Sequence, residues 1–501
     1  MSLTQLFLVL LAASLTLLAS IAAVRFADRI GLPALLGFLA LGLLLGEDAL
    51  GINFDDAQLT QNVGMVALAL ILIDGGLTTR WADVRALILP AGVLATLGVL
   101  VSAVVVAVGG HFLVGLDWRS AMLLGAIVSS TDAAAVFSVL RRLPIPGRVS
   151  GLLEAESGFN DAPTVILVLL LSAARVPDSP WDAALNIGYE LSVGAVLGLL
   201  VGMVGAWSAR RIALPASGLY PLVAVGFGMV SFAAAGTIHA SGFLAAYLTA
   251  MVMGNSRLPH RAATRSFAEG AAWLSQIGLF VMLGLLVDPS DLPPVMLPAI
   301  FLGAILLLVA RPVSVAASLV WFRIPWREQV LISVAGLRGA VPIVLATIPV
   351  VAEVPDSLQL LNMVFVLVVV FTVVQGPSLA PTARLLGLAS PGQARDVEIE
   401  SAPLDVLGAA LLTVVVPERS RLHGLYLYEL RLPKRSVINS IVRDGRLFVP
   451  SEHDRLRVGD ELMIVTMNDS RLATEARLRA LGRRGRLARW LGETGSELPH
   501  R

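Results

Sequence analysis

The chain has 501 residues, of which 56% are hydrophobic and only 15% are charged, and its mean hydropathy is +0.81. Because soluble domains carry about 25% charged residues, this composition indicates a polytopic membrane protein and not an enzyme of the soluble kind. The net charge of +1 gives no sign of a nucleic-acid partner, and the absence of cysteine excludes disulfides, cysteine metal sites and thiol chemistry.

Thirteen apolar segments are long enough, or nearly long enough, to cross a bilayer, which takes about 20 residues. The first lacks a basic start and a small-residue cleavage site, so we expect a retained helix and not a signal peptide. The second and the ninth are short. The predicted spans are 3–25, 33–47, 57–77, 84–110, 118–140, 148–173, 183–209, 217–236, 239–254, 264–286, 293–321, 328–350 and 358–383.

The loops between these segments differ in charge. Most loop arginines fall in the odd-numbered loops, whereas most loop acids fall in the even-numbered ones. By the positive-inside rule, the N-terminus is then outside and the C-terminus is cytoplasmic. A missing span would break the alternation, so the pattern favours thirteen.

Two predicted spans contain helix-breaking or polar residues. The fifth carries Ser129-Ser130-Thr131-Asp132 at membrane depth, and the twelfth carries Gly336, Gly339 and Pro342. Irregular backbone at that depth is tolerated only in a polar cavity or inside protein. The breaks are seven spans apart, so the two broken helices run in opposite directions. This spacing predicts an inverted repeat of spans 1–6 and 8–13, the arrangement that places a transporter's binding site near the midplane.

The character of the chain changes after about residue 386. Short alternating runs at 411–416, 425–432, 437–442, 447–450 and 461–467 predict strands, and Asp444-Gly445 predicts a hairpin turn. No Gly-x-Gly-x-x-Gly follows a strand, so we expect no dinucleotide cofactor. The predicted organisation is a transmembrane domain at 1–385, a linker at 386–401, a small α/β domain at 402–470 and a basic helical tail at 471–501.

The sixth span carries the polar cluster Glu156, Ser157, Asn160 and Asp161. On a helix, Glu156 lies one turn from Asn160, and Ser157 one turn from Asp161. An intramembrane carboxylate is costly, and it is functional by default. We therefore predict that Asp161 binds a proton and a metal cation in alternation, against the alternative of a carboxylate buried for packing alone.

Asp132 and Arg338 lie at the two helix breaks. Each has the charge sign that could compensate helix-end dipoles, and each could also contact the ion; the sequence leaves these roles open. Thr131 offers a hydroxyl and a freed carbonyl, and Glu156 could pair with Arg338. Isolated charges elsewhere in the spans, namely Asp74, Glu269 and Arg311, are more simply vestibule or helix-pairing residues.

The membrane part resembles the cation:proton antiporter superfamily, specifically its NhaP-like branch. The matching stretches are Leu32-Pro-Ala-Leu-Leu-Gly-Phe-Leu, Asp74-Gly-Gly-Leu, Ser130-Thr-Asp-Ala-Ala-Ala-Val-Phe, Glu154-Ala-Glu-Ser-Gly-Phe-Asn-Asp and Gly336-Leu-Arg-Gly-Ala-Val-Pro.

The resemblance implies an all-α fold of thirteen transmembrane helices, a homodimer and elevator-type alternating access. It implies that Asp161 carries cation and proton in turn, helped by Thr131, Asp132 and Ser157. The Asn160-Asp161 pair implies electroneutral exchange, and the resemblance also suggests a Glu156–Arg338 ion pair.

Residues 402–470 resemble the RCK-C or TrkA-C module of potassium-regulatory proteins, through Gly424-Leu-Tyr-Leu-Tyr-Glu-Leu, residues 441–450 and Leu456-Arg-Val-Gly-Asp-Glu-Leu. Antiporters that carry this module are often potassium/proton exchangers. The resemblance therefore implies potassium ahead of sodium, a bacterial inner-membrane location and a small regulatory ligand of unknown identity. A regulated cation channel and an organic-anion symporter are the alternatives from other classes. The broken-helix pair favours alternating access over a channel, and the excess of acidic groups disfavours an anion carrier.

Overall fold

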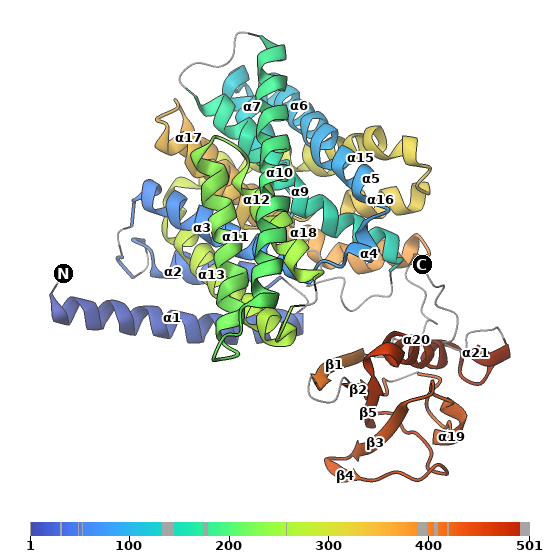
Figure 1. The fold of residues 1–501 in the computed structure, drawn as a ribbon. Coiled ribbons are helices and arrows are strands. Elements are labelled where there is room, and N and C mark those ends of the chain that lie inside the picture. The colour runs from blue at the N-terminus through green and yellow to red at the C-terminus, as the bar shows by residue number, and fades with distance from the viewer. Residues whose placement is uncertain are drawn as a thin grey trace. The chain divides into compact units, whose positions relative to one another are not determined.

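The computed structural model describes residues 2–30, 33–48, 50–52, 54–132, 145–173, 179–256, 258–388, 398–404, 409–417 and 420–490. The chain forms two compact units, Met1–Leu388 and Ala389–Arg501, which we treat separately (Figure 1). The first unit is helical in the residues described, and the second contains a β-sheet.

The first half of the helical unit comprises α1 (Leu3–Ile30), α2 (Leu35–Leu45), α3 (Ala57–Thr78), α4 (Trp81–Val84), α5 (Ile88–Val93), η1 (Leu94–Gly98), α6 (Val99–Gly109), η2 (Gly110–Val114), α7 (Trp118–Ile127) and α9 (Gly147–Ser172). The second half comprises α10 (Pro180–Arg211), α11 (Leu219–Thr237), α12 (Gly242–Gly254), α13 (Arg261–Leu285), η3 (Pro289–Asp291), α14 (Pro293–Ile305), η4 (Leu306–Ala310), α15 (Arg311–Leu319), η5 (Val320–Phe322), α16 (Trp326–Val334), α17 (Ala340–Val351) and α18 (Ser357–Leu385).

Helix is found in every predicted span. In the described part of the chain, eight helical segments are long and apolar enough to cross a membrane, and α2, α12 and α17 are shorter apolar helices. The other predicted spans involve a helix that is polar along its middle, α9, or helices that stop at a break, α7 and α16. A membrane-spanning helical fold is therefore clear, and the count of thirteen stays a prediction.

The predicted break in the twelfth span is confirmed, and the fifth span stops being helical where its break is predicted. α7 ends at Ile127, and the backbone is non-helical from Ser130 to Asp132; residues 133–144, which complete the predicted fifth span, lie outside the described residues. α16 ends at Val334, and α17 starts only at Ala340. Three glycines or prolines at 336, 339 and 342 make continuous helix costly across the second break.

The helices of this unit pack in two groups, which meet where α17 contacts α3 and where α9 contacts α10 and α12. In one, α3 packs on α12 and α13, and α12 packs on α10 and α11; Figure 1 shows these helices side by side. In the other, α9 packs on α5, α7 and α17, and α14 packs on α18. Because α7, α9, α16 and α17 share the second group, both helix breaks and the polar cluster of α9 are brought together there.

The second unit contains a five-stranded antiparallel sheet of order β1-β2-β5-β3-β4. Asp444 and Gly445 both have positive φ, as a two-residue primed turn requires, so the predicted hairpin between β3 and β4 is confirmed. The strands are β1 (Glu398–Leu404), β2 (Ala409–Val415), β3 (Ser436–Arg443), β4 (Arg446–Phe448) and β5 (Glu461–Met467), and the helices are α19 (Leu427–Leu430), α20 (Asn468–Arg484) and α21 (Leu487–Trp490).

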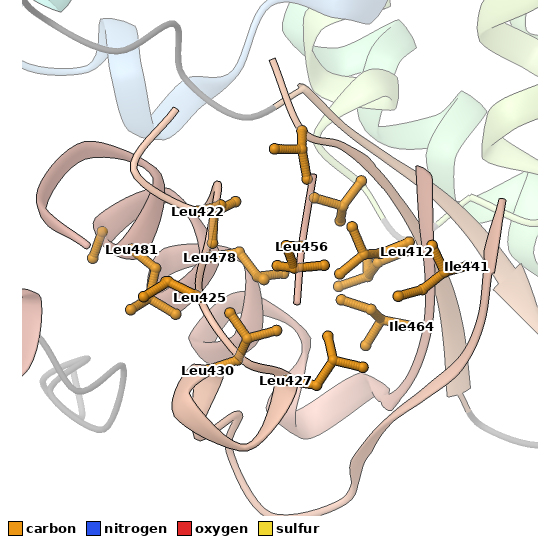
Figure 2. Close-up of a cluster of buried hydrophobic side chains, with 14 of the residues drawn as sticks. Leu412, Leu422, Leu425, Leu427, Leu430, Ile441, Leu456, Ile464, Leu478 and Leu481 are labelled. Atoms are coloured by element: carbon orange, nitrogen blue, oxygen red, sulfur yellow. The ribbon is translucent and has the colours of Figure 1, made fainter. Parts of the chain in front are cut away.

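One face of this sheet packs against helix to form a hydrophobic core (Figure 2). The strands contribute alternate residues, such as Leu412 and Val414 from β2 and Leu462 and Ile464 from β5, as the period-two geometry of a strand requires. Leu478 and Leu481 of α20 close the core. The predicted basic tail from residue 471 thus begins inside a helix that belongs to this unit.

Two further details differ from the predicted elements. The strand predicted at 425–432 is wrong, because its middle is the short helix α19, whose start is held by the Glu429 carboxylate accepting a hydrogen bond from the Tyr426 amide at 2.9 Å. β1 begins at Glu398, within the predicted linker, and pairs along its length with β2. Apolar alternation alone does not distinguish a half-buried helical turn from a strand.

Candidate functional site

The site lies where α9 passes the non-helical stretch that follows α7. Asp161 of α9 is 5% exposed and accepts a hydrogen bond of 2.6 Å from the Ser130 hydroxyl. Ser130 is fully buried. Since a carboxylate in a low-dielectric site is stabilised only by close polar partners, this pair fixes the position of the Asp161 side chain.

Two more α9 side chains hold the same non-helical stretch. The Asn160 amide nitrogen donates to the Thr131 hydroxyl at 2.6 Å, and the Ser157 hydroxyl donates to the Thr131 carbonyl at 3.0 Å. Residues 157, 160 and 161 are three and four apart, so they share one helix face. The structure therefore brings together four predicted site residues, Thr131, Ser157, Asn160 and Asp161.

Asp132 links the two helix breaks. Its amide donates to the Leu337 carbonyl at 2.9 Å, so the two non-helical stretches run against each other. Its carboxylate lies against Gly339, where a Cβ atom would come within 2.6 Å of Asp132 Cγ. Gly339 immediately precedes α17, and a carboxylate at that position faces the positive end of the helix dipole.

Arg338 lies beside the ends of two other half-helices. Its Nε donates to the carbonyl of Val128 at 3.1 Å, and Nη1 donates to the carbonyl of Gly336. These carbonyls follow α7 and α16, whose C-terminal ends carry partial negative charge. α18 supports the stretch from the other side, because the Thr372 hydroxyl donates to the Arg338 carbonyl at 3.1 Å.

Glu156 forms its ion pair with Arg311, and not with Arg338 as the resemblance suggested. The two terminal guanidinium nitrogens of Arg311, Nη1 and Nη2, contact the carboxylate at 2.6 and 2.8 Å, and both side chains are almost fully buried. Arg311 follows the π-helical turn η4 and also packs against Gly336. It therefore reaches the break and the carboxylate together, while Arg338 is occupied by backbone carbonyls.

Three comparisons bear on this arrangement. The family model described as "Sodium/hydrogen exchanger, transmembrane" matches residues 15–385, which is most of the chain. The chain belongs to the sodium/hydrogen exchanger family. It is a transporter and not an enzyme, and a second model, the TrkA-C domain, matches residues 411–479.

Relatives of this exchanger include a protein named K(+)/H(+) antiporter NhaP from Alkalimonas amylolytica, 36% identical over 91% of this chain and 81% of its own. A protein named K(+)/H(+) antiporter NhaP2 from Shewanella baltica is 37% identical over 88% of this chain and 78% of its own. The solved structure of the sodium proton antiporter MjNhaP1 from Methanocaldococcus jannaschii is similar in fold, with a TM-score of 0.66 and 20% identity over 76% of this chain and 99% of its own.

Three residues of the candidate site were not predicted as site residues. Ser130 stands directly before the Thr131-Asp132 pair, so its neighbours were a usable signal. Arg311 was assigned only a helix-pairing or vestibule role, and it does pair two helices. Thr372 left no signal, because a hydroxyl in an apolar helix more often bonds its own preceding turn.

We expect Gly339→Ala to lower the melting temperature and the exchange rate of the exchanger. The added methyl would collide with the Asp132 carboxylate, and such overpacking costs about 1–3 kcal/mol. A thermal-shift assay in detergent with a parallel liposome assay measures both. Gly278→Ala is the matched control, because a Cβ there meets nothing within 4 Å. Equal behaviour of the two variants would contradict the close packing of Asp132 on Gly339.

Proposed function

We propose that this chain is an electroneutral potassium/proton antiporter in which Asp161 binds a proton and a cation in turn. The observation that carries the proposal is the burial of Asp161 beside the non-helical stretch of residues 130–132. Buried carboxylates at a broken-helix pair are what ion-coupled transporters use at the membrane midplane. The names of the relatives favour potassium.

Oxygen atoms around Asp161 suit a monovalent cation. Ser130 and Thr131 contribute hydroxyls, and the side-chain oxygen of Asn160 is buried and has no hydrogen-bond partner among the described residues. Ser157 orients Thr131 through its carbonyl, and Asp132 adds a carboxylate on the adjoining residue. In this proposal, Asp161 is the exchanging group, and Asn160, Thr131, Ser157 and Asp132 complete the site.

Electroneutrality follows from the charge of the site. Asn160 is neutral, so one carboxylate changes its occupant in each half-cycle. A proton and a potassium ion both carry a single positive charge, and a complete cycle then moves no net charge. Glu156 and Arg338 have structural roles here: Glu156 neutralises Arg311, and Arg338 caps the two half-helix ends.

The setting of this exchange is also part of the proposal. We place the protein in the bacterial inner membrane with the N-terminus outside and the C-terminal unit cytoplasmic, on the arginine distribution of the loops. We also propose that the protein has thirteen transmembrane helices, forms a homodimer surrounded by lipid and works by elevator-type movement. The bound species are the transported potassium or sodium and the proton, with no other cofactor.

Exchange by purified protein in liposomes tests the function. A pH-sensitive dye inside the vesicles reports proton movement when potassium, sodium or lithium is added outside in turn. We expect the strongest response with potassium. A response to sodium alone would replace potassium by sodium as the substrate, and a current that needs no opposing proton gradient would favour the channel alternative.

The C-terminal unit is proposed as a regulatory module that binds a small ligand. We expect deletion of residues 402–501 to leave exchange intact and to change its dependence on pH and potassium, because every candidate ion-binding residue precedes residue 343. The deletion removes every residue of the unit's hydrophobic core, so no misfolded remnant of that core is left behind. Identical curves for full-length and truncated protein would remove the regulatory role, and complete loss of exchange would assign the module to assembly.

A further inference from the structure

A second polar contact on α9 lies outside the proposed ion site. Glu154 is seven residues before Asp161, which is about 10 Å along the helix toward its beginning at Gly147. Its carboxylate accepts a hydrogen bond of 2.8 Å from the Thr79 hydroxyl. Thr79 follows directly on α3, which belongs to the other group of helices. The contact thus bridges the two helix groups.

Tyr247 of α12 joins the same contact. Its hydroxyl is 3.3 Å from the Thr79 hydroxyl, and its ring lies on α9, where a Cβ at Gly158 would come within 2.6 Å of a ring carbon. Phe159 packs edge-on against that ring, with centroids 5.7 Å apart. Thr79 and Tyr247 are almost fully buried. The aromatic ring therefore packs on α9 at Gly158, a position between Glu154 and Asp161 along the helix.

The α3 and α12 side of the contact is rigidly held. The Asn255 amide group, at the end of α12, donates to the Thr79 carbonyl at 2.9 Å and accepts from the Trp81 amide at 2.8 Å. These bonds tie the ends of α3 and α12 to each other. A hydrogen bond from this fixed corner to a carboxylate on α9 restrains α9 relative to the other helix group, and charged hydrogen bonds are the stronger kind.

This inference rests on the proposed exchange at Asp161. We propose that Thr79 and Tyr247 are positioning residues that hold Glu154. They thereby keep α9 in the conformation in which Asp161 is inaccessible from the membrane face at which α9 begins. Exchange requires Asp161 to open to both sides in turn. The Thr79–Glu154 hydrogen bond then has to break once per cycle, and its strength sets how the two conformations are populated.

Removing the Thr79–Glu154 hydrogen bond should change the apparent affinity for the cation in opposite directions on the two faces of the membrane. The apparent KM on one face equals the intrinsic value divided by the fraction of molecules that are open to that face. In Thr79→Val we expect the cation KM measured from the face where α9 begins to fall about tenfold and the KM from the opposite face to rise, as loss of one charged hydrogen bond allows. Right-side-out and everted vesicles give the two faces.

The controls separate positioning from general damage. Thr79→Ser keeps the hydroxyl and should behave as the native protein. Tyr247→Phe keeps the ring on Gly158 and should show a smaller shift in the same sense as Thr79→Val. Equal changes of KM on both faces, or none, would overturn the proposal. If the native protein shows no exchange at all, the proposed function is refuted instead. Failure of this inference and failure of the proposed function are therefore distinguishable.

The absence of native cysteine allows an independent test. In Thr79→Cys/Glu154→Cys, a short thiol-reactive cross-linker should stop exchange, and reductant should restore it. Each single cysteine variant, treated in the same way, should continue to exchange. Undiminished exchange by the cross-linked double variant would overturn the proposal, even if Thr79→Val failed to fold.

Discussion

Asp161→Asn should abolish cation-dependent proton movement while leaving the protein folded. The amide has almost the shape of the carboxylate and can still accept the 2.6 Å hydrogen bond from Ser130, so packing is preserved. It cannot hold a proton and a cation in alternation, because it does not ionise. We expect a loss to the background of empty liposomes, measured with a pH-sensitive dye, and a melting temperature within a few degrees of the native value.

Asp182→Asn is the matched control, since Asp182 is an exposed carboxylate on the first turn of α10. It should exchange at the native rate. Sustained exchange by the Asp161→Asn protein would transfer the coupling role to another acid, and Asp132 would be the first to test because it adjoins the same stretch.

Arg311→Ala should destabilise the exchanger by about 3–5 kcal/mol, because it leaves the buried Glu156 carboxylate without its two charged donors. The melting temperature in detergent measures the loss. The effect should exceed that of any surface arginine, for which ion pairs contribute about 0–1 kcal/mol.

A double variant distinguishes an orphaned charge from lost packing. Arg311→Met/Glu156→Gln removes both charges while keeping similar volumes, and it should recover much of the melting temperature lost in Arg311→Ala. If the double variant is as unstable as the single one, the ion pair is not the reason for the instability.

The membrane architecture was predictable because it depends on the composition of short sequence segments. Apolar length predicted where the helices lie, and the glycines near Arg338 predicted where the twelfth span breaks. The number of spans is harder, since α9 has polar residues along its middle and α2 is short. Length and hydropathy alone do not recognise such helices, whose stability comes from packing against neighbours.

The geometry of the candidate site was predictable except for the choice of partners. The spacing of Ser157, Asn160 and Asp161 placed them on one face, and the structure brings that face to Thr131. The partner of Glu156 was not predictable, because Arg311 and Arg338 are both single buried arginines near a helix break. Which one reaches the carboxylate depends on how α15 and α17 pack, and no local pattern carries that information.

The C-terminal unit shows the same division. Period-two alternation and Asp444-Gly445 predicted four of the strands and one hairpin. β1 was missed because its Glu and Pro residues read as linker, although pairing with β2 makes it a strand. The amphipathic side of α20 was masked by its arginines, so its role in the core shows only in the structure.

The central claim is that a single carboxylate exchanges one cation for one proton, and its most direct test is exchange at fixed membrane potentials. Purified protein in liposomes is supplied with a potassium gradient, and the potential is set with an ionophore for an ion that the protein does not transport. The account predicts one initial rate of proton movement at all potentials. A rate that rises or falls steadily with the potential would show net charge movement and contradict exchange at Asp161 alone.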